Sequence, residues 1–369
     1  MHSIAHPSVF IDAEKLNSIR NYAAEAEKLK QLHPKQLELI YTEQWFNLYV
    51  PKIYNGLELS LQDGLHIEEA LAWVDGSTGW TVTLCSSANW FAGFLQQAAA
   101  EKLFGDVQVC FAGSGKTSGI ATVTEHGYNV TGQWHYATGA PHATVFTVNC
   151  TIEKDGAILQ TEQKTPLIKS FWFYKHEVTV LQEWNCTGMI ATASEGFEVK
   201  NLPIGPERCF IIKSSEAVLN HPLYQYPFLQ FAEATLAVNS SGMAVRFIDL
   251  CSELFQTKYE THKPAVTSMI NQKLEACMQQ LHNARKLFYA AVETSWNMLI
   301  AQQMIEEALL NTVSITSRSL AEIARKVIDD LYPYCGIIAA TSSSEINRVW
   351  RNMHTASQHA LLLLPYDKG

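Results

Sequence analysis

Residues 127–139 have the sequence GYNVTGQWHYATG, and this stretch decides the fold class because it lies between two long helical regions. From Tyr128 to Trp134, aromatic and β-branched residues recur in short alternation, which is typical of a half-buried strand. Gly127 and Gly132 fit turns or bulges, and Thr138-Gly139 fits a tight turn. The stretch therefore predicts β structure in the middle of the chain.

The same pattern of residues extends over a central unit from about Val107 to Phe210. Val, Thr, Tyr, Trp and Phe are concentrated there, and Gly and Asn interrupt them. Runs typical of strands lie at Tyr128–Trp134, Ala143–Thr151, Thr165–Tyr174, Glu177–Leu181 and Phe197–Leu202. Their number and spacing predict a β-sandwich or barrel.

Helical periodicity precedes and follows this unit. It begins at Asp12 and includes helices over about Leu61–Val74 and Ser77–Phe94. Long helices then follow over about Pro227–Gln256, Pro264–Gln303, Ser317–Leu331 and Ser343–Leu364. Long antiparallel helices of this kind form a bundle. We therefore predict an α+β protein with a helical domain over residues 1–106, a β domain over 107–213 and a four-helix bundle over 214–369.

The composition excludes several classes of protein. The 369 residues carry a formal net charge of −9 and no basic run, so we expect no nucleic-acid partner. No apolar segment is long enough to span a membrane, and the first ten residues lack the pattern of a signal peptide. The eight cysteines are widely separated, which excludes the usual zinc pairs, so we expect no metal site. We expect a cytoplasmic protein with reduced thiols.

Five motifs, in order along nearly the whole chain, resemble the acyl-CoA dehydrogenase superfamily. They are VPKIYNGL at 50–57, EALAWVDGSTGW at 69–80, the stretch at 127–139, Trp184 followed by GMIATAS at 188–194, and PER at 206–208. The resemblance implies the fold of that family: an N-terminal helical domain, a middle β domain and a C-terminal four-helix bundle. It also implies a bound flavin, FAD or FMN. A homotetramer is implied too, and the low charged fraction of 17% fits burial between subunits.

Two segments are similar to one branch of that superfamily, the two-component flavin-dependent monooxygenases of the 4-hydroxyphenylacetate hydroxylase and dibenzothiophene monooxygenase type. These are Trp134–Ala143 and the spacing of Arg348, Arg351, His354 and His359. Enzymes of this branch take reduced flavin from a separate reductase and react it with oxygen. The resemblance therefore implies a monooxygenase that acts on a small apolar or aromatic substrate.

Two other functions stay open. A FAD-dependent acyl-CoA dehydrogenase acting on CH–CH groups would need a carboxylate base at the flavin, for which Glu233, Asp249 and Glu253 are candidates. A relative that has lost its flavin and serves as a binding module is the third possibility. The position of the carboxylates relative to the flavin site distinguishes the first two functions.

A flavin ring needs a flat apolar surface and hydrogen-bonding groups along its edge. Trp134, Tyr136 and Trp184 are the aromatic candidates, although each also fits the core of a β domain. Thr138 and Gly139 offer a hydroxyl and a backbone N–H for flavin N5 and O4, and Thr192 offers a second hydroxyl. Ordinary turn caps would have the same residues.

The last predicted helix carries an apolar stripe beside a polar stripe of Arg348, Asn352, Thr355 and His359. We expect His359 and Thr138 to be the catalytic residues, because an imidazole can bind a phenolic oxygen near neutral pH. Arg348 is our candidate for the flavin phosphate, with Arg246, Lys258 and Arg285 as alternatives. The segment Ala112–Thr117, AGSGKT, lacks the glycine spacing and the following helix of a phosphate-binding loop.

Overall fold

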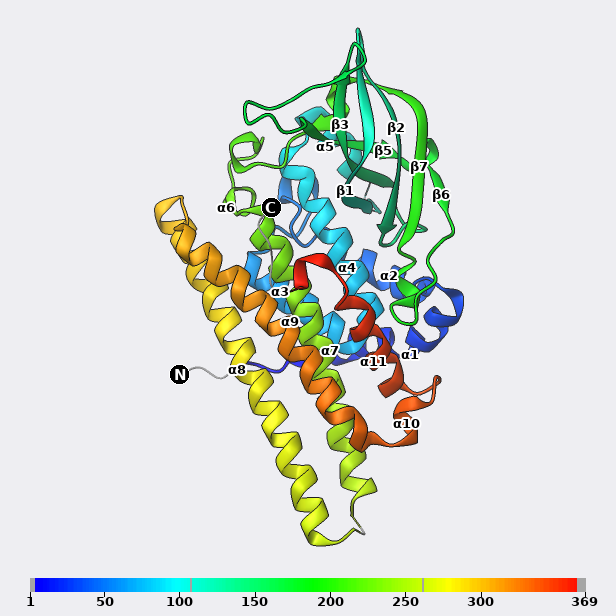
Figure 1. The fold of residues 1–369 in the computed structure, drawn as a ribbon, viewed down its shortest axis with the longest axis vertical. Coiled ribbons are helices and arrows are strands. Elements are labelled where there is room, and N and C mark those ends of the chain that lie inside the picture. Colours follow the sequence, from blue (N-terminus) through cyan, green and yellow to red (C-terminus); the bar gives the residue numbers. More distant parts are fainter. Residues whose placement is uncertain (1–3, 107, 261, 364–369) are drawn as a thin grey trace.

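The computed structural model describes residues 4–106, 108–260 and 262–363, and Figure 1 shows a sheet at one end of an elongated helical body. Val107 and Leu364, two limits of the predicted elements, lie outside the described residues. The helices that precede the sheet are α1 (Ala13–Leu29), α2 (Pro34–Thr42), α3 (Leu61–Val74), α4 (Gly76–Asn89) and α5 (Gln97–Phe104). The predicted order of helices, sheet and helices is confirmed.

The described strands form an eight-stranded sheet in the order β6-β7-β2-β1-β3-β5-β8, with β4 beside β3. Only β1 and β3 run parallel among these neighbours. The strands are β1 (Phe111–Thr124), β2 (Gly127–Ala137), β3 (Val145–Lys154), β4 (Ala157–Ile158), β5 (Ile168–Tyr174), β6 (Thr179–Leu181), β7 (Glu195–Ile204) and β8 (Cys209–Phe210). Each predicted strand overlaps one of these.

The C-terminal bundle consists of α7 (Phe228–Lys258), α8 (Pro264–Gln302), α9 (Glu307–Cys335) and α11 (Glu345–Ala356), with the short α6 (Pro222–Gln225) and α10 (Ile337–Ala340) as connections. Figure 1 shows α7, α8 and α9 running side by side along the length of the molecule. Among the described residues, no helix is long and apolar enough to cross a bilayer.

Two of the predicted bundle helices have wrong limits. The third bundle helix begins ten residues before Ser317 and continues through Pro333, ending where Gly336 takes φ +76°. The last helix ends at Ala356, because the chain turns and His359 caps the short 3-10 turn η9 (Ala360–Leu362). Leu362 is buried there, so the turn packs an apolar side chain onto the bundle.

Close contact between α3 and α7 joins the first domain to the bundle. A Cβ atom on Gly242 of α7 would lie only 2.3 Å from the carbonyl oxygen of Glu69 on α3, so a glycine is required for this approach. Glu69 and Ser241 therefore meet inside the protein and form a hydrogen bond. This contact fixes α4, which follows α3, against the sheet and the bundle.

Candidate active site

A cavity of about 210 Å³ lies where α4, the sheet and α7 meet. Thr83 and Ser87 of α4 form one wall, and β1, β3 and β5 form another through residues that include Gly113–Gly115. The start of α7 and the C-terminal turn with His359 complete the wall. Thr138, at the end of β2, also lines the cavity, so the two residues predicted to be catalytic face the same space.

The segment Ala112–Thr117 is part of β1, and no helix follows it directly. Its pairing with β3 is irregular between Ser114 and Gly119, and the Asn149 side-chain amide donates to the Gly115 carbonyl at 3.0 Å. An irregular strand beside a cavity changes the direction of its side chains and its backbone groups. Gly113–Gly115 were not among the site residues predicted from the sequence, although the density of glycines there was an available signal.

Thr138 is the first member of a buried chain of three hydroxyl groups. Its Oγ1 lies 2.8 Å from Ser194 Oγ, which lies 2.7 Å from Thr192 Oγ1, and Thr192 donates to the Met189 carbonyl at 2.9 Å. A carbonyl only accepts, so Ser194 donates to Thr192, and Thr138 donates to Ser194. The hydroxyl of Thr138 therefore presents lone pairs, not its proton, to the cavity.

Gly139 has a structural role beside these hydroxyl groups, in the corner formed by the end of β2 and the loop 188–194. Its backbone N–H donates to the Thr192 carbonyl at 2.9 Å, and its φ of +76° forms the tight turn that the sequence predicts. The expectation that this N–H points at a flavin is wrong, because the N–H is used within the protein. Together with the Thr138–Ser194 bond, this contact joins β2 to the loop 188–194.

Backbone strain is concentrated around these hydroxyls. Tyr136, Met189 and Ala193 have φ values of +67°, +54° and +43°, a region that residues other than glycine seldom occupy. Such conformations persist only where the surrounding structure holds them, and they cluster at functional sites. Three of the eleven described non-glycine residues with positive φ therefore lie around these hydroxyls.

Of the three aromatic candidates, Tyr136 and Trp184 have accessible rings, although neither of them lines the cavity. Tyr136 is 62% exposed, and its ring meets that of Trp184 edge-on with 6.3 Å between centroids. The Trp184 indole N–H donates to the Met189 carbonyl at 2.9 Å, which ties this ring to the hydroxyl chain. Tyr136 and Trp184 thus lie beside the strained corner and have accessible faces.

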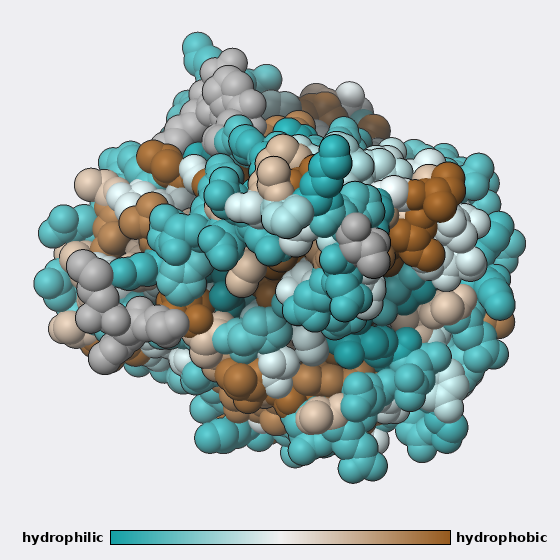
Figure 2. All heavy atoms as spheres, turned by 90° about the horizontal axis from the view of Figure 1, so that it is seen from below, coloured by the Kyte–Doolittle hydropathy of each residue, from teal (hydrophilic) through white to brown (hydrophobic). Residues whose placement is uncertain are grey.

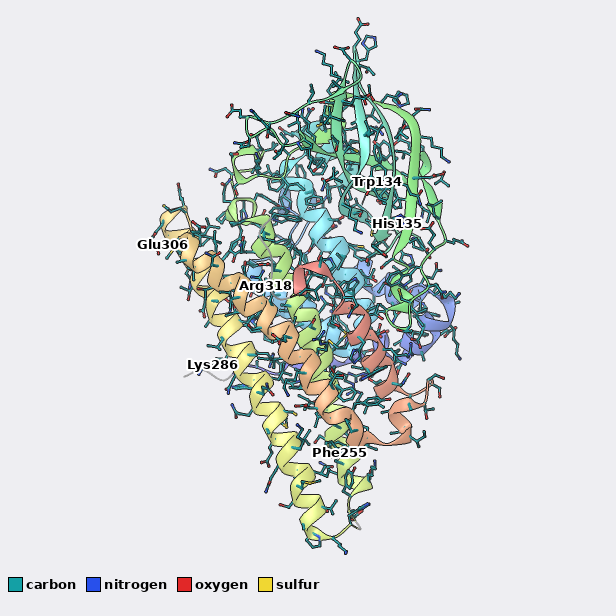
Figure 3. All side chains as sticks on the ribbon, viewed as in Figure 1. Trp134, His135, Phe255, Lys286, Glu306 and Arg318 are labelled. Carbon is teal, nitrogen blue, oxygen red and sulfur yellow. The ribbon has the colours of Figure 1, made fainter. Side chains whose placement is uncertain are left out.

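The third aromatic candidate, Trp134, was predicted to contact the flavin, but it lies in the core of the β domain. It is fully buried, stacks on Phe197 with 5.4 Å between centroids, and donates its indole N–H to the Asn149 carbonyl at 3.2 Å. Figure 3 shows it within the sheet. Trp134 is therefore a core residue of the β domain. The alternation of residues in this strand was compatible with a core position as well as with a flavin contact.

The polar row of the last helix anchors the loop 188–194 instead of lining the cavity. Asn352 accepts a hydrogen bond from the Met189 N–H at 2.6 Å, and Thr355 accepts one from the Gly188 N–H at 3.0 Å. A Cβ atom on Gly188 would lie 2.0 Å from the Arg351 carbonyl oxygen, so helix and loop are in close contact. The helix therefore positions the segment that carries Thr192 and Ser194.

The cations proposed for a flavin phosphate have partners inside the protein. Arg348 is buried, with its Nε 3.8 Å from Asp75 Oδ1, and it does not line the cavity. The alternatives are engaged as well: Arg246 pairs with Glu345, Arg285 pairs with Glu69, and Lys258 donates to the Tyr334 carbonyl. All four cations thus have a partner within the protein.

His359 is outside the helix on which it was predicted, yet it lies on the wall of the cavity. Its Nδ1 accepts the Leu361 N–H at 3.3 Å, so the proton of the neutral ring is on Nε2. Burial lowers the pKa of His359 to about 4, which keeps the ring neutral at pH 7. His359 is therefore a neutral hydrogen-bond donor. By contrast, His354 pairs with Asp329 at 2.9 Å and does not line the cavity.

The three carboxylates considered as dehydrogenase bases lie away from the cavity lining. Glu233 is fully buried and accepts from Arg318 at 2.5 Å. Asp249 accepts the Trp73 indole N–H at 2.6 Å, and Glu253 is exposed. Figure 3 shows Arg318 on α9, within the bundle. In the described part of the chain, no group of three potential ligands could hold a metal ion.

Comparisons with known proteins agree with this architecture. Residues 234–363 match the family model described as the acyl-CoA dehydrogenase C-terminal domain. The indole-3-acetate monooxygenase of Pseudomonas putida is 23% identical over 352 residues, which cover 94% of this chain and 88% of that protein. The oxygenase subunit HsaA of a Mycobacterium tuberculosis flavin-dependent monooxygenase is 24% identical over 362 residues, with 94% and 89% covered.

Solved structures show the same fold. The crystal structure of HsaA from M. tuberculosis superposes with a TM-score of 0.87 at 23% identity, covering 95% of this chain and 93% of that one. XiaF from Streptomyces, in complex with FADH2 and glycerol, gives a TM-score of 0.84 at 20% identity, with 95% and 91% covered. The resemblance to the acyl-CoA dehydrogenase superfamily, and to its monooxygenase branch, is confirmed.

Proposed function

We propose that this chain, which has the acyl-CoA dehydrogenase fold and the C-terminal domain of that family, is the oxygenase component of a two-component flavin-dependent monooxygenase. It would receive reduced FAD or FMN from a separate reductase and insert one oxygen atom into a small aromatic substrate. The other oxygen atom would leave as water, with the two electrons supplied by the reduced flavin. The hydroxylases and monooxygenases among its relatives support this reading.

One observation carries the proposal: the cavity presents a neutral histidine donor and a threonine lone pair, whereas Glu233, Asp249 and Glu253 are elsewhere. A dehydrogenase removes a proton from the substrate and needs a base at that place. An oxygenase instead needs a water-poor cavity with donors that hold the substrate oxygen. The groups at this cavity fit the second requirement.

The residues beside the cavity, around Thr138 and the loop 188–194, fit a flavin. Tyr136 and Trp184 would cover one part of the ring, and Thr138 would meet its polar edge. Reduced flavin carries a proton on N5, where oxidised flavin has a lone pair. The orientation of the hydroxyl chain gives Thr138 a free lone pair, which matches the reduced form. We therefore revise the expected role of Thr138 from donor to acceptor.

The proposal is tested with the purified chain, chemically reduced FAD or FMN, and isotopically labelled oxygen. We expect one oxygen atom from the gas in the product for each equivalent of reduced flavin consumed, with phenols and indoles as first substrates. Oxygen consumption that yields only hydrogen peroxide with every substrate would contradict the proposal. Desaturation of an acyl-CoA by the FAD-loaded chain would favour the dehydrogenase.

A prediction follows for Thr138. Thr138→Val keeps the shape but removes the lone pair that faces the cavity, so the preference for reduced over oxidised flavin should fall by about tenfold, the value of one hydrogen bond. Thr138→Ser keeps the acceptor and should keep the preference. Equilibrium titration of both flavin forms measures the ratio, and an unchanged ratio in Thr138→Val would return Thr138 to a turn residue.

We also propose a homotetramer. The long helix α8 exposes four apolar side chains, Met269, Met278, Leu287 and Ile300, each close to half or more accessible. Figure 2 shows apolar patches among hydrophilic residues on the face seen along the bundle. Burial of such patches favours association. Light scattering over a dilution series should give four times the mass of the chain, and a monomer at all concentrations would refute this assembly.

A further inference from the structure

The cavity beside Thr138 is lined by uncharged groups, and this composition limits the substrate that it can accept. Within the described ranges, no Asp, Glu, Lys or Arg contributes to its wall. His359 is neutral at pH 7, because burial lowers its pKa to about 4. A buried carboxylate is costly unless a positive group pairs with it, and the described wall supplies none.

One side of the cavity is aromatic. Phe91, in the 3-10 helix η4 (Trp90–Phe94) that follows α4, lies 5.5 Å from Phe210 of β8 and 5.6 Å from Phe228 of α7, measured between ring centroids, and all three line the cavity. Three rings at these distances leave faces and edges for a fourth ring. This wall therefore favours a flat, apolar ligand.

Two polar side chains on the cavity wall, Ser87 and His359, can form hydrogen bonds with a neutral ligand. The Ser87 hydroxyl is buried and has no hydrogen-bond partner among the described residues, although Ser87 lines the cavity. The Nε2–H of His359 is a second donor, because its Nδ1 already accepts from Leu361. A buried polar group without a partner is destabilising, so a ligand that satisfies it gains affinity.

Resting on the proposed function, we infer that the substrate is a neutral aromatic compound with a hydrogen-bonding oxygen or nitrogen, such as a phenol or an indole. Aromatic acids are excluded, because their carboxylate would be buried without a countercharge. This differs from what the names of two relatives state, the indole-3-acetate monooxygenase of P. putida and the p-hydroxyphenylacetate 3-hydroxylase oxygenase component of Acinetobacter baumannii.

Matched pairs of ligands test the inference: indole against indole-3-acetate, and 4-methylphenol against 4-hydroxyphenylacetate. The chain is saturated with reduced FAD or FMN in the absence of oxygen, and each dissociation constant is measured by calorimetry. We expect each acid to bind at least about 100-fold more weakly than its neutral partner. Equal or tighter binding of the acids, or no binding of either neutral compound, would overturn the inference.

A gain-of-charge variant adds a second test. Ala232 lies on the α7 wall of the cavity, and Ala232→Arg would place a cation there, whereas Ala232→Met adds length without charge. The arginine variant should narrow the gap between acid and neutral ligand by at least about tenfold, and the methionine variant should not. Equal effects of the two variants would count against a charge-based exclusion.

Admission of oxygen then separates this inference from the proposed function. If the neutral ligands bind preferentially but no oxygenated product forms, the ligand class stands and the monooxygenase proposal fails. If product forms from the acids as efficiently as from the neutral compounds, the monooxygenase proposal stands and the ligand class is wrong. The two statements can therefore fail independently.

Discussion

His359→Ala should lower product formation with reduced flavin at least about 100-fold, the usual effect of losing a positioned donor in a water-poor site. The side chain lies on the cavity wall, and its Nδ1–Leu361 contact directs the Nε2 proton away from the backbone. Single-turnover measurements with the product quantified per reduced flavin give this number. His359→Gln keeps an N–H donor and should recover part of the activity.

The control is His354→Ala, which removes an imidazole of similar sequence position. His354 pairs with Asp329 and packs against Trp350 at 4.4 Å, away from the cavity, so its loss should leave product formation nearly unchanged. If both alanine variants lose activity to the same extent, or if His359→Ala only lowers the melting temperature, His359 is a structural cap of the last turn.

The lowered pKa of His359 determines whether the stability of the fold rises or falls with pH. The unfolded chain binds a proton at this residue below about pH 6.5, but the folded chain does so only below about pH 4. His359 therefore costs no stability above pH 6.5, and it weakens the fold as the pH decreases from 6.5 to 4. Between these values the wild type should lose more stability than His359→Gln, measured by urea unfolding.

The fold was predictable because its signals are local. Alternation in residues 127–139 and helical periodicity in α7 and α8 depend on neighbours in the sequence, so the order of domains follows from them. The end of the last helix at Ala356 depends on long-range packing of Leu362, which no local pattern carries. This is why His359 was expected on the helix and lies beyond it.

The site was predictable only in part for the same reason. Thr138, Gly139, Thr192 and Trp184 come from sequence segments that meet through tertiary hydrogen bonds, and only the family resemblance grouped them. Trp134 and Tyr136 lie two residues apart on one strand and look alike in sequence, yet one is fully buried and the other is 62% exposed. Ser87 had no sequence signal, because an unpartnered hydroxyl is recognisable only in three dimensions.

Arg285→Met should lower the free energy of unfolding by about 3–5 kcal/mol, the range found when one member of a buried ion pair is removed. Glu69 is fully buried and accepts from Arg285 Nε and Nη2 at 2.8 Å each, and from the Tyr289 hydroxyl at 2.8 Å. Burial raises the pKa of Glu69, but Arg285 and the hydrogen bonds outweigh it and lower the pKa. The variant would thus leave a carboxylate uncompensated at the contact of α3, α7 and α8.

Urea unfolding of a set of variants separates this effect from a loss of packing. Glu69→Gln/Arg285→Met removes both charges and should cost less than Arg285→Met alone. Lys35→Met breaks the exposed Lys35–Glu38 pair, whose side chains are 58% and 65% accessible, and should cost no measurable free energy of unfolding.

The pH dependence gives a second test. Because the pKa of Glu69 is lowered in the folded protein, the stability that Glu69 contributes is present above the ordinary glutamate pKa. That stability disappears as the pH falls through the folded pKa. The deficit of Arg285→Met should therefore shrink in strong acid, and a deficit independent of pH would assign the loss to packing.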